Sequence, residues 1–397
     1  MAQLSNRLNR LAPSATLAMS QKSNEMKSQG IDVINMSVGE PDFMTPDHIK
    51  EAGKKAIDEN YSKYSPVPGY PALRNAIVKK LKNENNLDYT TNEIIVGTGG
   101  KQGVCNTFMA LCNDGDEVII PAPYWVSYPQ MAKLAGATPI IVRGGFEQDF
   151  KITPAQLESA ITPKTRMLVL CSPSNPTGSV YSQEELNALA EVILKHDELY
   201  VLSDEIYEHI NYLGKHASIA SYPGMKERVV LCNGVSKAYA MTGWRLGWVA
   251  APEWIVKGIN KLQGQYTSGT CDVSQIAALA AYEGSQQCVE DMRNAFERRR
   301  NLIVELVSHI PGLEIRRPDG AFYIFPKCSS FFGKTDGTRV INDSSDLAMY
   351  ILEVGKVATV GGDAFGEPEC IRMSYATSDE NIKEAIKRIG DALSLLK

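Results

Sequence analysis

Short apolar runs alternate with longer amphipathic segments through the middle of the chain. The apolar runs have the length and composition of strands covered on both faces, as in parallel sheets. They occupy residues 93–96, 117–120, 139–142, 167–171, 200–203, 229–232 and 246–250. The segments between them fit helices, and Ser182 and Glu185 form a capping box ahead of an apolar helical stripe. The alternation predicts an α/β fold, with a mostly parallel sheet between two helical layers.

The two ends of the chain have a different pattern. Residues 286–309 fit one long charged helix, and 321–325 and 371–375 fit strands. Thr377 and Glu380 form a second capping box before a C-terminal helix. The apolar positions of that helix are Ile382, Ile386, Ile389, Leu393 and Leu396. Because residues 1–47 show little periodicity, we predict a large domain over 48–285 and a small α+β domain built from 1–47 and 286–397.

Three consecutive arginines, 298–300, lie near the end of the predicted helix over 286–309. An anion-binding site is one interpretation of such a run. A solvated helical face is the favoured one, because charge runs on helices usually face water.

Composition narrows the class of protein. Of 397 residues, 44% are hydrophobic and 22% charged, and the net charge of −5 favours neither nucleic acid nor an acidic membrane as a partner. The N-terminus lacks the apolar core of a signal peptide, and no apolar run approaches the roughly 20 residues of a membrane helix. The eight cysteines are scattered without a C-x-x-C pair, which indicates free thiols in the cytoplasm and no metal site.

Lys237 carries the strongest chemical signal, in the motif SKAYAMTGWR over residues 236–245. Its amine can form a Schiff base with an aldehyde, while Ser236 and Arg245 can hold phosphate oxygens. Pyridoxal 5′-phosphate combines these two groups. A second phosphate element is the turn GTGGKQG over 97–103, where Gly100 and Lys101 open a predicted helix whose N–H groups can face an anion. A plain tight turn is the alternative there.

Three more motifs follow predicted strands, where open α/β sheets bind ligands. In SDEIYE over 203–208, Asp204 can keep a pyridine nitrogen protonated and Tyr207 can donate to the ring oxygen; a helix cap and core packing are the alternatives. In SPSNPTG over 172–178, a rigid loop can aim Asn175 at the ring and a substrate carboxylate, or form an Asx-turn. In PAPYW over 121–125, Trp125 can stack on the ring or pack in a core.

In this order the motifs resemble the class I aminotransferases of the fold-type I pyridoxal-phosphate enzymes, most closely the bacterial aspartate aminotransferases. The resemblance spans nearly the whole chain, from PSAT at 13–16 and GEPD at 39–42 to IRMSYA at 371–376. It implies a homodimer with shared active sites, in which Lys237 binds the cofactor and moves protons. Asp204 pairs with the pyridine nitrogen, Tyr207 and Asn175 contact the ring oxygen, and Trp125 stacks on the ring. The residues implied to surround the phosphate are Gly100, Lys101, Ser236, Arg245 and Tyr64 of a neighbouring subunit.

The resemblance also implies the substrates. Arg372 binds the α-carboxylate with Asn175 and the Gly39 backbone, and Lys101 with Thr16 binds a distal carboxylate. L-aspartate, L-glutamate, oxaloacetate and 2-oxoglutarate then react by a ping-pong mechanism at one site. Relatives that use prephenate often have a basic residue before PSAT, where this chain has Ala12. A prephenate, aromatic or alanine aminotransferase and a C–S β-lyase stay open as alternatives. A non-catalytic regulator is disfavoured because Lys237, Asp204 and Arg372 are all present.

Overall fold

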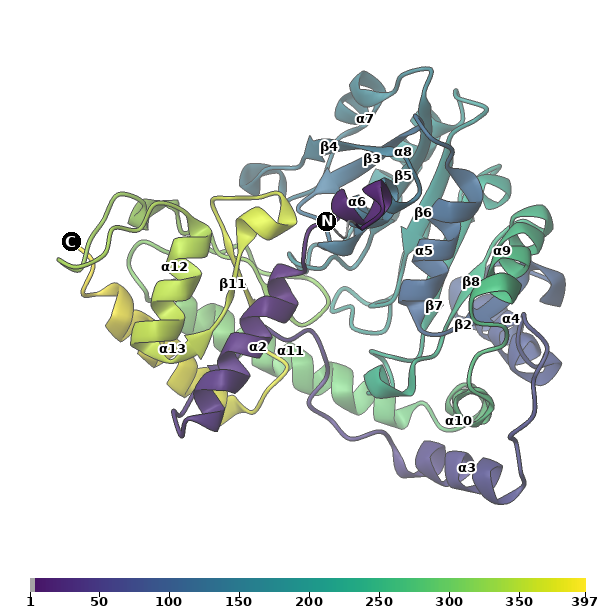
Figure 1. The fold of residues 1–397 in the computed structure, drawn as a ribbon, viewed down its shortest axis with the longest axis horizontal. Coiled ribbons are helices and arrows are strands. Elements are labelled where there is room, and N and C mark those ends of the chain that lie inside the picture. The colour runs from purple at the N-terminus through teal and green to yellow at the C-terminus, as the bar shows by residue number, and fades with distance from the viewer. Residues whose placement is uncertain (1–3) are drawn as a thin grey trace.

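A seven-stranded sheet forms the centre of the larger part of the molecule (Figure 1). The computed structural model describes residues 4–397. The strands are β2 (Ile94–Gly97), β3 (Glu117–Ala122), β4 (Thr138–Arg143), β5 (Thr165–Cys171), β6 (Tyr200–Asp204), β7 (Val229–Gly234) and β8 (Gly247–Ala250), in the spatial order β2-β8-β7-β6-β5-β3-β4. Only β8 runs antiparallel to its neighbours, so the predicted mostly parallel sheet is confirmed. The carboxyl ends of the other six strands therefore meet at one edge of the sheet.

Helices cover both faces of this sheet because successive side chains of a strand point to opposite sides. Ile95, Val118 and Val230 pack on one side with α5 (Gly100–Leu111), α6 (Ser127–Leu134) and α9 (Glu253–Tyr266). Val96, Ile119 and Leu231 pack on the other. The helices on that side are α3 (Asp47–Asp58), α4 (Pro71–Asn85), α7 (Pro154–Ala160), α8 (Gln183–Ile193) and α10 (Asp272–Glu283). The predicted three-layer α/β fold is thereby confirmed.

A second core combines residues from both ends of the chain. Ile34 and Met36 pack there with apolar residues of the last third of the sequence. The elements of this part are β1 (Ile34–Asn35), α11 (Gln287–Ser308), β9 (Tyr323–Ile324), α12 (Ser344–Tyr350), β10 (Val357–Ala358), β11 (Val360–Gly361), β12 (Ile371–Ser374) and α13 (Asp379–Leu393). The strands β11, β12 and β9 form an antiparallel sheet, and β1 pairs with β10. The domain boundaries at 48 and 286 stay a prediction.

Residues 6–28 contact both parts of the molecule. The short helix α1 (Asn6–Asn9) contacts helix α6, which packs on the large sheet. Helix α2 (Ala15–Ser28) lies beside β11 (Figure 1). The pattern of residues 1–47 did not predict α2, because Ser23 is its only fully buried residue and no apolar stripe marks it. None of the helices in residues 4–397 has the length and apolar character that a membrane crossing requires.

Two local predictions were wrong. The C-terminal helix starts one residue later than expected: Ser378 is its N-cap and accepts the Asn381 N–H, so Thr377 and Glu380 form no capping box. The arginines do not form a solvated face either. Arg300 is buried and donates to the carbonyl of Pro318, while Arg299 is buried in a bidentate pair with Asp42. Only Arg298 points into solvent, where it pairs with Asp379.

Candidate active site

A cavity of about 310 Å³ opens where the carboxyl ends of the parallel strands meet. Its wall contains every predicted site residue except Tyr64. These residues are Thr16, Gly39, Gly100, Lys101, Trp125, Asn175, Asp204, Tyr207, Ser236, Lys237, Arg245 and Arg372. The loops after β2, β3, β5, β6 and β7 supply most of them, and the N-terminal segment and β12 close the other side.

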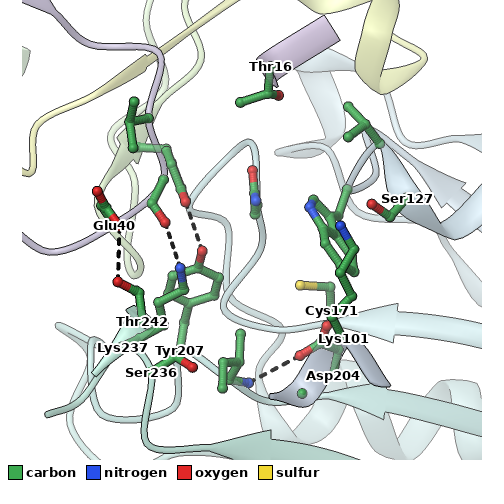
Figure 2. Close-up of a pocket in the computed structure, with 18 of the residues that line it drawn as sticks. Thr16, Glu40, Lys101, Ser127, Cys171, Asp204, Tyr207, Ser236, Lys237 and Thr242 are labelled. Atoms are coloured by element: carbon green, nitrogen blue, oxygen red, sulfur yellow. Dashed lines mark hydrogen bonds between the residues drawn. The ribbon is translucent and has the colours of Figure 1, made fainter. Parts of the chain in front are cut away.

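The amine of Lys237 lies inside this cavity (Figure 2). Its Nζ atom donates a hydrogen bond to the Gly39 carbonyl at 2.5 Å. The pKa of Lys237 is lowered to about 8, chiefly by burial and also by Arg372 and Arg245, while Glu40 and Asp204 oppose the shift. Near neutral pH the unprotonated, nucleophilic amine is therefore far more populated than in an ordinary lysine.

The carboxyl group of Asp204 ends β6 on the floor of the cavity. Tyr128 donates its hydroxyl to Asp204 Oδ2 at 2.7 Å, and the Ile206 N–H donates to Oδ1 at 3.3 Å. Burial raises the pKa of Asp204 to about 6, although both hydrogen bonds counteract the shift. No helix starts at this aspartate, since turns follow β6, so the helix-cap alternative does not apply. A desolvated acid in this position suits a protonated ring nitrogen as its partner.

Arg372 presents a guanidinium group to the cavity from β12. Its Nη1 donates to Asn175 Oδ1 at 3.0 Å, its Nη2 donates to the Ser37 carbonyl, and its Nε has no partner. Burial lowers the pKa of Arg372, and only tyrosines, not carboxylates, oppose that shift. Because a buried cation without an anion is costly, this fork is suited to a carboxylate ligand.

Tyr207 also lines the cavity, and Arg372 lies near its hydroxyl. That hydroxyl is 2.8 Å from the hydroxyl of Tyr323, and both tyrosines are buried. Arg372 packs on the Tyr323 ring, with its guanidinium carbon 4.7 Å from the ring centroid. The Tyr207 hydroxyl is thus held by the Tyr323 hydroxyl, and either of the two can be the donor.

A candidate anion cradle forms another part of the cavity wall, from Gly100, Ser236 and Arg245. Helix α5 begins at Gly100, after Gly99 in a left-handed conformation with φ of 78°. A Cβ atom on Gly99 would lie 2.5 Å from Arg245 Nη2, so the guanidinium group packs directly on the start of the helix. Ser236 lines the same cavity. Free N–H groups, a hydroxyl and a cation together match the needs of a phosphate group.

One loop carries three residues of the site: Ser236, Lys237 and Arg245. Residues 235–246 connect β7 to β8, and Gly234 pairs with Gly247 at the ends of those strands. A Cβ on Gly234 would lie 2.7 Å from the Gly247 Cα, and one on Gly247 would lie 2.1 Å from the Gly100 nitrogen. The base of the loop therefore closes against the start of α5, with only glycines at the contact.

Figure 2 shows Lys101 on the wall opposite Glu40 and Thr242, together with Ser127, which the sequence did not single out. The Lys101 amine is 5.1 Å from the centroid of the Trp125 ring. Burial, followed by the charge of Arg245, lowers the pKa of Lys101. Thr16 reaches the cavity from α2. Within residues 4–397 no carboxylate contributes to the charge around Lys101, so this cation can accept a second carboxylate.

Tyr64 does not belong to this cavity within its own chain. Its side chain is 99% exposed and lines a separate groove with Tyr61 and residues 269–272. The prediction that it serves a neighbouring subunit is compatible with this exposure and is not tested by a single chain.

Three of the cavity residues that sequence reasoning missed make hydrogen bonds within the site. Tyr128 bonds to Asp204, Tyr323 bonds to Tyr207, and Glu40 accepts a hydrogen bond from Thr242 at 2.9 Å. A signal existed for Tyr128, which lies one helical turn after Trp125, and for Glu40, which follows Gly39. Tyr323 lies in an apolar strand, where a tyrosine has no distinguishing pattern.

The residues present fit pyridoxal 5′-phosphate. The cavity combines phosphate ligands with an amine of lowered pKa and an acid of raised pKa. The unpartnered Nε atom of Arg372 leaves a donor for a further, anionic ligand.

Comparison with known proteins identifies the family. A family model described as aminotransferase class I and II matches residues 31–389. A relative from Rickettsia bellii, named "Probable aspartate/prephenate aminotransferase", is 49% identical over all of both chains. The aspartate aminotransferase structure from Rhizobium meliloti is 41% identical with a TM-score of 0.97, covering 100% of each chain. That of the Thermus thermophilus aspartate aminotransferase with maleate is also 41% identical, with a TM-score of 0.93 over 99% of this chain and 100% of the other. The chain belongs to the class I and II aminotransferases, enzymes that transfer amino groups.

Proposed function

We propose that this aminotransferase uses pyridoxal 5′-phosphate to move an amino group between L-aspartate or L-glutamate and 2-oxoglutarate or oxaloacetate. The observation that carries the proposal is the shared cavity of Lys237 and Asp204. Burial moves the pKa values of these two groups toward neutrality from opposite sides. The phosphate cradle and the carboxylate-binding arginine flank them.

The cofactor, when bound, supplies an electrophilic carbon for amines and a ring that accepts negative charge from the substrate's α-carbon. Lys237 would hold it through Nζ and would move a proton to or from the substrate's α-carbon. Asp204 would hold a proton on the ring nitrogen, and Tyr207 with Asn175 would donate to the ring oxygen. Trp125 would stack on the ring. Gly100, Lys101, Ser236 and Arg245 would hold the phosphate.

Arg372 orients the substrate. Its paired N–H groups bind the α-carboxylate together with Asn175 and the Gly39 backbone. Because Gly39 also accepts the Lys237 hydrogen bond, the segment that binds the substrate lies directly over the reacting amine. Closure of this segment would exclude water from the α-carbon. Amino acid and oxo acid use the same groups in turn, so the kinetics should be ping-pong.

A dicarboxylate substrate is supported by Lys101 and Thr16 on the far wall. The Thermus thermophilus structure contains maleate, itself a dicarboxylate. Prephenate activity is the second candidate, because the printed name of the Rickettsia bellii relative includes prephenate. Ala12, in place of a basic residue, argues for aspartate as the better substrate.

We further propose a homodimer in which Tyr64 reaches the phosphate of the neighbouring subunit. Its exposure, the greatest of any large hydrophobic side chain in the described part of the chain, supports a role outside its own cavity. A cytoplasmic location is supported by the cysteines, all eight of which are free.

Replacing Lys237 tests the proposal. The Lys237→Ala variant should lose the absorbance of the lysine–cofactor bond and about 10⁴-fold or more in transamination, because both the anchor and the proton carrier are removed. Titration of the wild type with L-amino acids should convert the cofactor spectrum most readily with aspartate and glutamate.

Two results would contradict the proposal. Wild-type turnover in Lys237→Ala would exclude the lysine from the reaction. Release of pyruvate and ammonia from cystathionine without an added oxo acid would assign the chain to the C–S β-lyases instead.

A further inference from the structure

A buried polar network lies beneath the loops that carry Tyr207 and Lys237. Its centre is the carboxylate of Glu208, which pairs with the Lys80 amine from α4. Asn233 Nδ2 donates to Glu208 Oε1 at 2.7 Å, and Asn85 Nδ2 donates to Oε2 at 2.9 Å. Lys80 also donates to Asn85 Oδ1 at 2.7 Å. All four side chains are buried, and every oxygen of the carboxylate has a partner.

Charge balance shows that the network is built around an ionised glutamate. Burial opposes ionisation, but Lys80, His209 and His216 outweigh it and hold the pKa of Glu208 well below its ordinary range. Glu205 and His216 come within reach of the same carboxylate, a grouping that can suit a metal ion. The Lys80 ammonium already takes the place of a cation there.

The network connects two loops at the point where the sheet stops holding them together. Pairing of β6 with β7 ends at Asp204 and Cys232, and the Glu205 N–H makes a final main-chain bond to the Cys232 carbonyl at 2.9 Å. Beyond that main-chain bond, one side-chain hydrogen bond joins residues 205–212 to residues 233–245 in the described part of the chain. It is the bond from Asn233 to Glu208. Tyr207 directly precedes Glu208, and Ser236 and Lys237 follow Asn233 by three and four positions.

We propose that Glu208 and Asn233 are positioning residues, whose hydrogen bond sets the spacing between the Asp204–Tyr207 loop and the Ser236–Lys237 loop. The inference rests on the proposed function for its consequence, since these loops would hold the ring and the reacting amine. Neither residue lines the cavity, so both act through their neighbours. A displacement of about 1 Å in such groups can cost about 100-fold in rate.

Four variants separate positioning from general stability. Asn233→Ala and Glu208→Leu remove the bond between the loops. Asn85→Ala is the matched control, because it removes the other amide donor to Glu208 and leaves the Asn233 bond. Glu208→Gln keeps an oxygen for Asn233 and removes the charge that Lys80 requires, so its melting temperature should fall. Asn233→Ser, too short to reach Glu208, replaces Asn233→Ala if that variant does not fold.

The readout is the titration of Lys237 in cofactor-free protein. Its reaction with an amine-specific reagent is followed against pH by mass spectrometry of the Lys237 peptide. The wild-type amine should titrate near its pKa of about 8. Asn233→Ala and Glu208→Leu should raise that value by at least about half a unit, because a displaced amine regains contact with water. Their kcat/KM with aspartate should fall about 100-fold. Asn85→Ala and Glu208→Gln should keep the wild-type titration.

Two outcomes would overturn the proposal: an unchanged Lys237 titration in Asn233→Ala, or an equal shift in Asn85→Ala. Failure of the proposed function is seen separately, as a wild-type protein that does not take up pyridoxal 5′-phosphate. The lysine titration needs no cofactor and still decides the positioning role in that case.

Discussion

Single side chains in the cavity are tuned by one physical cause, the removal of water. The same burial that brings the pKa of Lys237 down to about 8 brings that of Asp204 up to about 6. Each group is thus held close to the protonation change that its proposed role requires. This arrangement lowers the stability of the folded state, because a buried group that ionises loses hydration.

Asp204 should therefore destabilise the cofactor-free protein above pH 6. The folded state binds the Asp204 proton more tightly than the unfolded state, whose pKa is near 3.8, so stability is lost as pH rises from 3.8 to about 6. A shift of about two units corresponds to about 3 kcal/mol. The Asp204→Asn variant should lack this loss and should be the more stable protein above the window, although inactive. Urea unfolding of both proteins below and above the window measures the difference, and a constant difference would contradict it.

Lys101 should control the choice of substrate. Lys101→Ala should lower kcat/KM for aspartate by roughly 10–100-fold, the value of a hydrogen bond to a charged group. Alanine lacks a distal carboxylate, so its kcat/KM should fall less, through the loss of the Lys101–phosphate contact alone. Steady-state assays with both amino acids decide the matter, and equal losses would remove Lys101 from distal recognition.

For single residues, the sequence predicted which side chains line the cavity, but not which neighbouring side chains hold them in place. Lys237, Asp204, Asn175 and Arg372 lie in distinctive motifs, and all four line one cavity. The support that Tyr323 gives to Tyr207 depends on packing between two sheets far apart in sequence. No local pattern reports such a contact.

Among the secondary-structure elements, the start of helix α5 allows the most direct test. Gly99→Ala should weaken pyridoxal 5′-phosphate binding about tenfold, because the added methyl group would displace Arg245 from the phosphate cradle. The left-handed backbone should add a loss of about 1 kcal/mol in stability. Gly30→Ala is the control, since its φ of 82° is similar and nothing lies within 4 Å of the new Cβ. It should lose stability alone; an equal loss of cofactor affinity would contradict the account.

Elements were predictable where one face is buried. The strands of the central sheet and helices such as α8, with its Ser182 capping box, follow directly from apolar pattern and caps. Helix α2 has no such stripe, and its placement depends on tertiary contacts with β10 and β11. Arg299 and Arg300 were not predicted to be buried. Arg299 pairs with Asp42, which is far away in the sequence, and Arg300 donates to the Pro318 carbonyl as well as to the nearby Glu297.

For the whole molecule, the proposed dimer predicts complementation between two defective chains. Tyr64→Ala should bind the cofactor weakly, and Lys237→Ala should be inactive. Mixed dimers should regain activity, because one of their two sites would combine an intact Lys237 with a Tyr64 from the other chain. Assays after unfolding and refolding the two variants together measure the recovery. Activity no greater than that of Tyr64→Ala alone would place Tyr64 outside the neighbouring site.

The loop between β7 and β8 has a consequence for how the site tolerates motion and change. Since the anchor amine and the phosphate-binding arginine share one segment pinned at both ends by glycines, thermal displacements of the two should be correlated. The distance between Lys237 and Arg245, which would hold the two ends of the cofactor, would then stay constant while the rest of the cavity wall varies. Substrate preference can thus diverge through mutations elsewhere in the wall, whereas an insertion within 235–246 should abolish every activity together.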